Sequence, residues 1–265
     1  MKVVFLTGSH PRHMALAKAI ERTGKLAGLV IEEREDHIPA VPLGLSAALA
    51  ELFVRHFGGR AEAEETFFGD AATDRLEVPT LRIQRKHLNT SRVRGFVSAQ
   101  SPTLVLSYGV HKLTEATLNS FPEARWNIHG GLSPQYRGVI THFWPSYMLE
   151  PKWTGVTLHE LSDQLDAGAI IHQTAAPLVR GDGIHQLACR AVLAFAEEFP
   201  KVLEMKSCGQ IKPPVGQNSP GKLWVGSDWR PEHLKVVYET YGNRIVDAYL
   251  DGLLGTSEPT LVRQF

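Results

Sequence analysis

The chain has 265 residues, of which 43% are hydrophobic and 21% are charged, a composition typical of a globular protein and not of a disordered or fibrous one. Lys plus Arg and Asp plus Glu each total 28, so the formal net charge is zero, whereas a protein that binds nucleic acid through its phosphates usually has a basic excess. We expect one large domain, or one domain with a small appendage, and no nucleic-acid partner.

The cysteines and the first residues indicate the compartment. Cys189 and Cys208 make neither a disulfide framework nor a four-ligand zinc site. The apolar run at residues 3–6 stops before Gly8, which is too short for the core of a signal peptide or for a membrane-spanning helix. We therefore expect a cytoplasmic protein that does not associate with membranes.

The opening of the chain predicts a strand–helix–strand unit. Residues 3–6 and 26–31 are apolar runs, and residues 14–20 between them have apolar positions at helical spacing. This order is typical of a parallel sheet, which binds ligands beyond the carboxyl ends of its strands. The turn at Gly8 lacks the spaced glycines of a dinucleotide-binding loop and the Gly-Lys-Ser/Thr of a P-loop, which disfavours NAD and ATP.

The same turn offers a site for an anion. Ser9, His10 and Arg12 stand where the predicted helix begins, so backbone N–H groups and a guanidinium converge there. A phosphorylated substrate could bind to these residues. The alternative is a solvated turn that holds no ligand.

Residues 36–74 interrupt the alternation of strands and helices. They read as a helical insertion, with one helix at 45–57 and a second at 61–68. Its charged side chains are expected to form exposed ion pairs along the helices, namely Arg55, Arg60, Glu62, Glu64 and Glu65.

Beyond this insertion, the pattern predicts the rest of an α/β sheet. Strands are expected at 79–83, 102–107, 126–129, 155–161 and 169–173, the last two as an antiparallel pair, and helices at 113–121 and 184–204. After residue 208 turn residues dominate, followed by a helix at 232–250. We divide the chain into a main domain at 1–208 and a small C-terminal extension at 209–265.

The most informative residues lie at the end of the predicted strand 126–129. Asn127 and His129 are two positions apart, so their side chains face the same way just before Gly130. An amide and an imidazole placed together can polarise a carbonyl and move a proton. Asp166 stands in a turn before the next strand, and a carboxylate beside His129 would raise the pKa of the imidazole. Without a Ser or Cys nucleophile in this stretch, direct acyl transfer is favoured over a covalent intermediate.

Each of these signals is weak alone, because Asn-x-His is a common pattern and Asp166-Ala167-Gly168 is an ordinary turn. Together with their neighbours, however, they resemble the formyltransferase family, which includes glycinamide ribonucleotide formyltransferase and the N-terminal catalytic domain of methionyl-tRNA formyltransferase. The resemblance covers roughly residues 1–205 and rests on three blocks in the family's order: Asn127-Ile128-His129-Gly130 with Pro134 and Arg137-Gly138, Gly155-Val156-Thr157-Leu158, and Leu165-Asp166-Ala167-Gly168-Ala169-Ile170-Ile171.

The resemblance implies an α/β, Rossmann-like formyltransferase fold, a mostly parallel sheet flanked by helices, here with a small C-terminal appendage. It also implies 10-formyltetrahydrofolate as formyl donor and an amine as acceptor. Asn127 would then bind the formyl oxygen as it becomes an oxyanion, His129 would stabilise it and transfer a proton, and Asp166 would orient His129.

Donor and acceptor contacts also follow from the resemblance. The folate would lie against backbone groups and an apolar pocket at His111, Lys112, Leu113, Leu161, Ser162 and Asp163. Arg137 would contact the acceptor, together with the anion site at the first turn. We expect no metal, because the histidines are scattered over different elements and complete no familiar ligand spacing.

The sequence departs from the family in the loop after His129. Where the family has Ser-Leu-Leu-Pro, this chain reads Gly131-Leu132-Ser133-Pro134, and the preceding Tyr108-Gly109 segment is one residue longer. Because this loop borders the reacting groups, the geometry of the acceptor, or the acyl donor itself, could differ.

The acceptor is inferred mainly by elimination. The 55 or so residues after the main domain are too few for a tRNA-binding domain, and zero net charge agrees. A small amine remains, foremost an amino sugar, nucleotide-linked or not. Two alternatives stay open: a 10-formyltetrahydrofolate hydrolase, disfavoured because the chain begins directly with its first strand, and a folate- or nucleotide-binding protein without turnover. A homodimer is compatible with all three.

Overall fold

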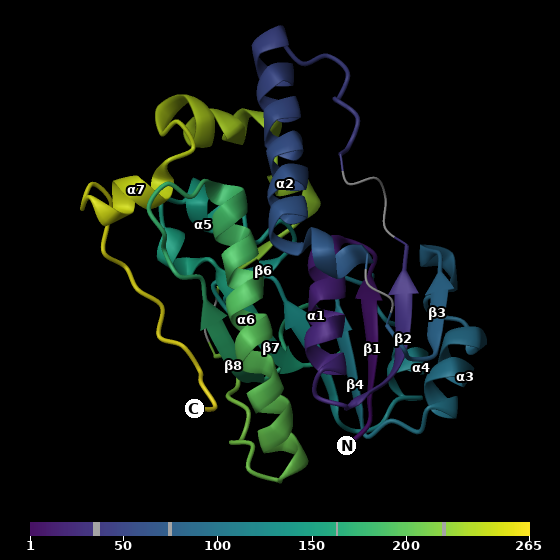
Figure 1. Cartoon of the computed structure of the whole chain (residues 1–265). Coiled ribbons are helices and arrows are strands. Elements are labelled where there is room, and N and C mark those ends of the chain that lie inside the picture. Colours follow the sequence, from purple (N-terminus) through teal and green to yellow (C-terminus); the bar gives the residue numbers. More distant parts are fainter. Residues whose placement is uncertain (34–37, 74–75, 163, 219–220) are drawn as a thin grey trace.

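The computed structural model describes residues 1–33, 38–73, 76–162, 164–218 and 221–265 (Figure 1). Its centre is a seven-stranded sheet with the order β3-β2-β1-β4-β5-β7-β8, in which β1 to β5 pair in parallel and β7 and β8 join antiparallel. The strands are β1 (Val3–Gly8), β2 (Leu26–Glu32), β3 (Thr80–Ile83), β4 (Leu104–Tyr108), β5 (Arg125–His129), β7 (Gly155–Glu160) and β8 (Ile170–Ala175). The predicted α/β fold and the antiparallel final pair are confirmed.

Helices cover both faces of the sheet. They are α1 (Pro11–Glu21), α2 (Ala47–Thr73), α3 (Ser91–Ala99), α4 (Glu115–Leu118), α5 (Trp144–Tyr147), α6 (Ile184–Ser207) and α7 (Ile245–Leu250). Short 3-10 helices lie at Arg85–His87, Pro151–Trp153, Gly226–Asp228 and Pro231–His233, and a π-helix at Val236–Thr240. In the ranges that the structure describes, no helix has the length and apolarity needed to cross a membrane.

The first strand shows how the core is divided. Val3 and Phe5 point into a cluster shared with α1, α2 and α6, whereas Val4 and Leu6 point into a second cluster shared with α3 and α4. Successive side chains of a strand face opposite sides of a sheet, so a strand buried on both faces is apolar at every position. This is why residues 3–6 form an uninterrupted apolar run.

The segment 47–73 is a single helix, so the prediction of a helical pair is wrong. Gly58 and Gly59 lie inside α2, where each glycine costs about 1 kcal/mol relative to alanine. The helix continues through them because it packs on α1 and α6 and buries Phe53, Ala63 and Phe68 along its length. Tertiary burial thus outweighs the local preference of the two glycines.

The prediction of exposed ion pairs on this helix is wrong for Glu64, whose side chain is only 5% exposed. Its carboxylate forms an ion pair and hydrogen bond with the guanidinium of Arg12 at the start of α1. Arg55 and Arg60 lie over the aromatic rings of Tyr238 and Phe57. Glu64 and Arg55 therefore connect α2 to other elements, whereas the Arg60 contact lies within the helix.

Replacing Glu64 by glutamine is expected to lower the free energy of unfolding by about 2–3 kcal/mol, because the largely buried Arg12 would lose its charged partner. Urea unfolding would measure the change. The matched control is Glu204→Gln, which removes the pair with Lys25 (Nζ–Oε2 2.7 Å). The Glu204 side chain is 58% exposed, so a much smaller change is expected. Equal effects of the two variants would contradict the assignment.

The prediction of one helix at 232–250 is wrong, because three short helical segments occupy this range. A 3-10 helix and a π-helix come first, and α7 begins at Ile245 only after a turn in which Gly242 and Asn243 have φ values of 58° and 63°. Gly and Asn are the residues that adopt such left-handed backbone most readily. The predicted helix at 113–121 is likewise shorter, at Glu115–Leu118.

The C-terminal segment packs closely on the main domain. Its strand β9 (Lys222–Trp224) pairs in parallel with β6 (Tyr136–Gly138) in a separate two-stranded sheet. An apolar, largely aromatic cluster joins the two parts of the chain and includes Phe53, Phe143, Trp144, Trp224, Val237 and Tyr238. The extension therefore contacts the loop that follows His129.

Candidate active site

Asn127, His129 and Asp166, which the sequence singles out, converge in the structure. Asn127 and His129 lie at the carboxyl end of β5, and Asp166 lies in the connection between β7 and β8. Because β7 pairs with β5, the turn after β7 returns Asp166 to the two side chains. Asp166 has a φ of 48°, a left-handed conformation that Asp tolerates better than most residues.

The carboxylate of Asp166 is the centre of the cluster. Its Oδ2 lies 3.3 Å from Nδ1 of His129 and accepts the backbone N–H of Gly138 at 3.0 Å. Its Oδ1 accepts the Asn127 amide at a longer 3.4 Å. His129 and Asp166 are 6% and 8% exposed, so they interact in a largely water-free environment, where hydrogen bonds and charges act strongly.

A fourth residue, His159, completes the cluster and was not predicted as part of it. It faces Asn127 across the β5–β7 pair; its Nε2 lies 3.1 Å from Nδ2 of Asn127 and 3.5 Å from Oδ1 of Asp166. Its Nδ1 donates to the carbonyl of Glu160 at 2.7 Å, which leaves Nε2 to accept the Asn127 amide. His159 could have been predicted from the antiparallel register of β5 and β7, which places position 159 opposite position 127.

The amide of Asn127 is held in one orientation. Ser107, at the end of β4, donates its hydroxyl to Oδ1 of Asn127 at 2.7 Å, so the Nδ2 group faces His159 and Asp166. An amide fixed in this way presents N–H donors in a constant direction, as the stabilisation of an oxyanion requires.

The charges in the cluster differ from the expectation in one respect. Burial alone would raise the pKa of Asp166, but His129, His159 and the Gly138 N–H lower it to about 2. Burial lowers the pKa of His129, although Asp166 and the carbonyl of Tyr136 oppose this. Asp166 raises the pKa of His129, as predicted, but the net pKa is lowered because desolvation exceeds the effect of the carboxylate. At neutral pH the pair is an ionised Asp166 beside a neutral imidazole.

The loop after His129 and the C-terminal extension hold the cluster in place through hydrogen bonds. Nε2 of His129 donates to the carbonyl of Tyr136 at 2.7 Å, and Gly138 of the same strand β6 donates to Asp166. From the C-terminal extension, Gln217 donates to the carbonyls of Asp166 and Gly168 at 2.9 and 2.7 Å. The extension thus holds the turn that carries Asp166, a contact that no sequence pattern predicts.

Arg137 lies beside this cluster in β6, between the two residues that contact it. Its guanidinium donates to the carbonyl of Gly221 at 3.2 Å, and its positive charge contributes to the lowered pKa of His129. Arg137 therefore lies next to the cluster, and its contact to the acceptor stays a prediction.

The predicted anion site at Ser9, His10 and Arg12 lies at the carboxyl end of β1. Arg12 is engaged there by Glu64, and the ring of His10 stacks on that of His13 at 5.5 Å. Burial lowers the pKa of the neighbouring His142 to about 4, with smaller contributions from Arg12 and His129. The positive charge of Arg12 in the first turn and the ring of His129 in the cluster therefore both influence the pKa of His142.

The two segments expected to hold folate meet in the apolar cluster under α3 and α4. Leu113 is buried there, and Val110 and Leu161 pack against the same cluster. The backbone N–H and ring of His111 engage Glu32, the carbonyl of Lys112 accepts the Asn89 amide, and Ser162 donates to the carbonyl of Gln164. Asp163 lies outside the described residues. Within those residues, no group of three or more His, Cys, Asp or Glu side chains is arranged to hold a metal ion.

Comparison with known proteins gives three findings. A sequence model described as "Formyl transferase" matches residues 60–203, just over half of the chain. The trifunctional purine biosynthetic protein adenosine-3 of Bos taurus is 35% identical over 105 residues, which are 38% of this chain and 10% of that protein. The match therefore spans about a tenth of the length of this curated relative.

The third finding concerns solved structures. The phosphoribosylglycinamide formyltransferase of Anaplasma phagocytophilum is 23% identical with a TM-score of 0.57, over 84% of this chain and 96% of that one. An N-formyltransferase of Helicobacter canadensis, solved with folinic acid and dTDP-3-aminofucose, is 14% identical with a TM-score of 0.53, over 87% and 73% of the two chains. At these identities the likeness shows a shared fold.

Proposed function

Because the chain belongs to the formyl transferase family of enzymes, as its sequence predicts, we propose that it transfers a formyl group from 10-formyltetrahydrofolate to the amine of a small molecule. The observation that carries the proposal is the convergence of Asn127, His129 and Asp166 at the carboxyl end of the sheet. An oriented amide, a neutral imidazole and an ionised carboxylate are the groups that direct acyl transfer to an amine needs.

In the proposed reaction, the amine nitrogen attacks the formyl carbon, and the N10–formyl bond of the folate breaks as His129 passes to N10 the proton that it has taken from the amine. The Nδ2 group of Asn127 stabilises the formyl oxygen while it is an oxyanion, with one N–H exchanging its long 3.4 Å contact with Asp166 for that oxygen. His129 accepts the proton that the amine loses at Nδ1, because its Nε2–H already donates to the Tyr136 carbonyl. The imidazolium formed in this way faces two acceptors, Asp166 and that carbonyl, which stabilise it when it is charged.

For the donor, the pterin ring lies against the apolar wall of Leu113 and Leu161, with His111, Lys112 and Ser162 around it. The meeting of the two segments in one cluster supports this placement. The backbone N–H of His111 donates a hydrogen bond to the Glu32 carboxylate. It can donate to the folate only after this hydrogen bond is broken. The bound folate supplies the formyl carbon, and the protein supplies its orientation.

For the acceptor, we propose an amino sugar, nucleotide-linked or not, held by Arg137 and by the turn at Ser9 and His10. The ion pair between Arg12 and Glu64 offsets the positive charge of that turn, which favours an acceptor without a free phosphate monoester there. The similar Helicobacter protein was solved with a nucleotide-linked amino sugar, in agreement with this substrate class.

The test is an absorbance assay of the conversion of 10-formyltetrahydrofolate to tetrahydrofolate, with a panel of free and nucleotide-linked amino sugars and amino acids. Conversion that requires an acceptor supports the transferase. Conversion without any acceptor would instead identify a hydrolase. Folate binding without conversion under any condition would overturn the catalytic proposal and leave a binding protein.

The pH dependence of this reaction should reflect the buried imidazole. His129 must be neutral to accept the amine proton, and its pKa is lowered from the ordinary value of about 6.5. The acid limb of kcat/KM, where the rate falls as pH decreases, is therefore expected below pH 6.5. A profile measured from pH 4.5 to 8 checks this, provided that the acceptor amine is titrated separately. An acid limb at pH 7 or above that belongs to the enzyme would contradict a neutral His129.

A further inference from the structure

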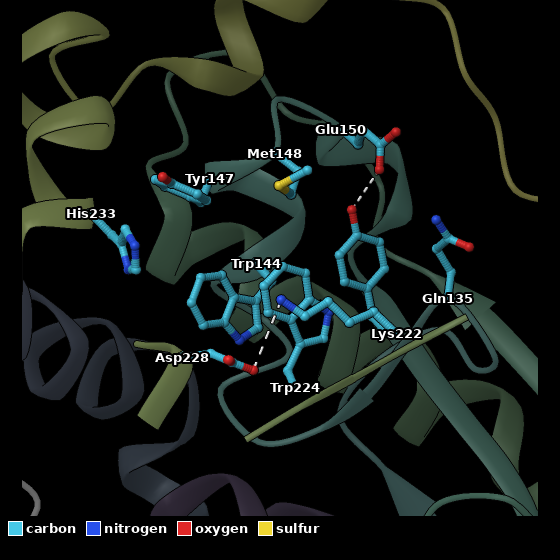
Figure 2. Close-up of a pocket in the computed structure, with 10 residues that line it drawn as sticks. Gln135, Trp144, Tyr147, Met148, Glu150, Lys222, Trp224, Asp228 and His233 are labelled. Atoms are coloured by element: carbon cyan, nitrogen blue, oxygen red, sulfur yellow. Dashed lines mark hydrogen bonds and ion pairs between the residues drawn. The ribbon is translucent and has the colours of Figure 1, made fainter. Parts of the chain in front are cut away.

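A cavity of about 500 Å³ lies next to the candidate active site but is lined by other side chains. Tyr136 stands between the two: its carbonyl accepts the hydrogen bond from His129, whereas its ring lines the cavity. Figure 2 shows the lining side chains, which come from β6, from α5 and the residues after it, and from the C-terminal extension. The volume is within the ordinary range for a small-molecule site.

Aromatic rings build the floor of this cavity. The indoles of Trp144 and Trp224 stack with their centroids 4.1 Å apart, and the ring of Tyr136 is parallel to that of Trp224, 6.4 Å from it. Tyr147 forms another part of the lining. Such rings present electron-rich faces, which attract positively charged or weakly positive groups.

One donor in this floor lacks an acceptor. The indole N–H of Trp144 donates to the carbonyl of Val139 at 3.1 Å. The indole nitrogen of Trp224 is buried in a side chain only 8% exposed, and no described residue accepts its hydrogen bond. Buried donors are rarely left unpaired, so this N–H is suited to an oxygen of a bound molecule.

The charged lining favours a cation. The ammonium of Lys222 lies 3.6 Å from the ring centroid of Trp224 and 3.9 Å from the carboxylate of Asp228 (Figure 2). This side chain shows where an ammonium is held between an aromatic face and an acid. Glu150 is a second carboxylate, bound by the hydroxyl of Tyr136, and burial lowers the pKa of His233, which keeps its ring neutral. Carboxylates thus outnumber cations, and an anionic ligand is disfavoured.

We propose that this cavity binds a hydroxylated amine with the chemistry of an unphosphorylated amino sugar, at a site distinct from that of formyl transfer. The ammonium of the ligand takes the position of Lys222 between Trp224 and Asp228, a ring or hydroxyl oxygen accepts the Trp224 N–H, and the remaining hydroxyl groups donate to Glu150 and Asp228. Lys222 has an exposed, flexible side chain and moves aside. A nucleobase is disfavoured because, once Lys222 has moved aside, it would bring no positive charge to the carboxylate of Asp228.

The test measures binding directly by calorimetry, with glucosamine as probe and without folate, so that it does not depend on catalysis. Trp224→Phe keeps the aromatic packing and removes the N–H, and it is expected to weaken glucosamine binding about tenfold. The matched control is Trp229→Phe, since the Trp229 N–H is also without a described partner but does not line the cavity; it should bind like the parent protein. Asp228→Asn, which keeps an oxygen for the Val225 N–H, should also weaken binding about tenfold.

Three further measurements decide whether the site is the one proposed. His129→Ala is expected to bind glucosamine as the parent protein does, and glucose 6-phosphate is expected to bind at least about tenfold more weakly than glucosamine. No saturable binding of glucosamine, equal loss in the two tryptophan variants, or loss in His129→Ala would overturn the proposal, the last by placing the ligand in the active site. Tighter binding of a nucleoside than of glucosamine would also overturn it.

Discussion

Replacing His129 by alanine is expected to lower kcat for formyl transfer by about 10²–10⁴-fold, the usual contribution of a positioned general base. The variant loses the only imidazole among the described residues that contacts both the Asp166 carboxylate and the Tyr136 carbonyl. KM for the donor should change much less, because the proposed folate wall at Leu113 and Leu161 is untouched. Steady-state kinetics with the best acceptor of the panel would measure both constants.

The control for this variant is His87→Ala, in the 3-10 helix that follows β3, for which kcat should stay within about twofold. Thermal unfolding of both variants separates a catalytic loss from a loss of structure. A His129→Ala enzyme that retains kcat within a few-fold of the parent would remove His129 from the proposed mechanism.

Replacing Asp166 by asparagine is expected to lower kcat by about 10²–10³-fold, because the imidazolium formed during the reaction loses its charged partner. The same change should alter how stability depends on pH. The pKa of Asp166 is about 2 in the folded protein and about 3.9 in an unfolded chain. Its ionisation therefore stabilises the fold by roughly 2 kcal/mol above pH 4, and this stabilisation is lost as pH falls from about 4 to 2.

Urea unfolding of the parent protein and of Asp166→Asn between pH 2.5 and 7 tests this sign. The difference in free energy between them should be constant above about pH 4.5 and should shrink as pH falls towards the folded pKa. Asp251→Asn, in a half-exposed pair with Arg180 (2.8 Å), is the matched control and should show little pH-dependent difference. A difference that grows on acidification would mean that burial raises the pKa of Asp166 more than His129 and His159 lower it.

The sequence was informative where local pattern and tertiary packing agree. The apolar run of β1, the paired positions of Asn127 and His129, and the turn at Asp166 each have a period or a spacing that determines their geometry. The family blocks then indicated which of these polar residues meet in space.

The sequence was misleading where long-range contacts decide the structure. Glu64 looks like a solvated helix residue, and only the packing of α2 on α1 brings it to Arg12. The same packing carries the helix through Gly58 and Gly59. His159 could not be placed near Asn127 without the register of β5 and β7, and the net pKa of His129 depends on burial, which spacing does not reveal.

The pairing of β6 with β9 has a consequence for synthesis of the protein. A growing chain that has emerged as far as α6 already contains Asn127, His129 and Asp166, but it lacks the strand that aligns Tyr136 and Gly138 with them. Contacts between distant parts of a chain form late, since their loops must close first. Asn127, His129 and Asp166 are therefore expected to reach their final alignment only after Trp224 has left the ribosome.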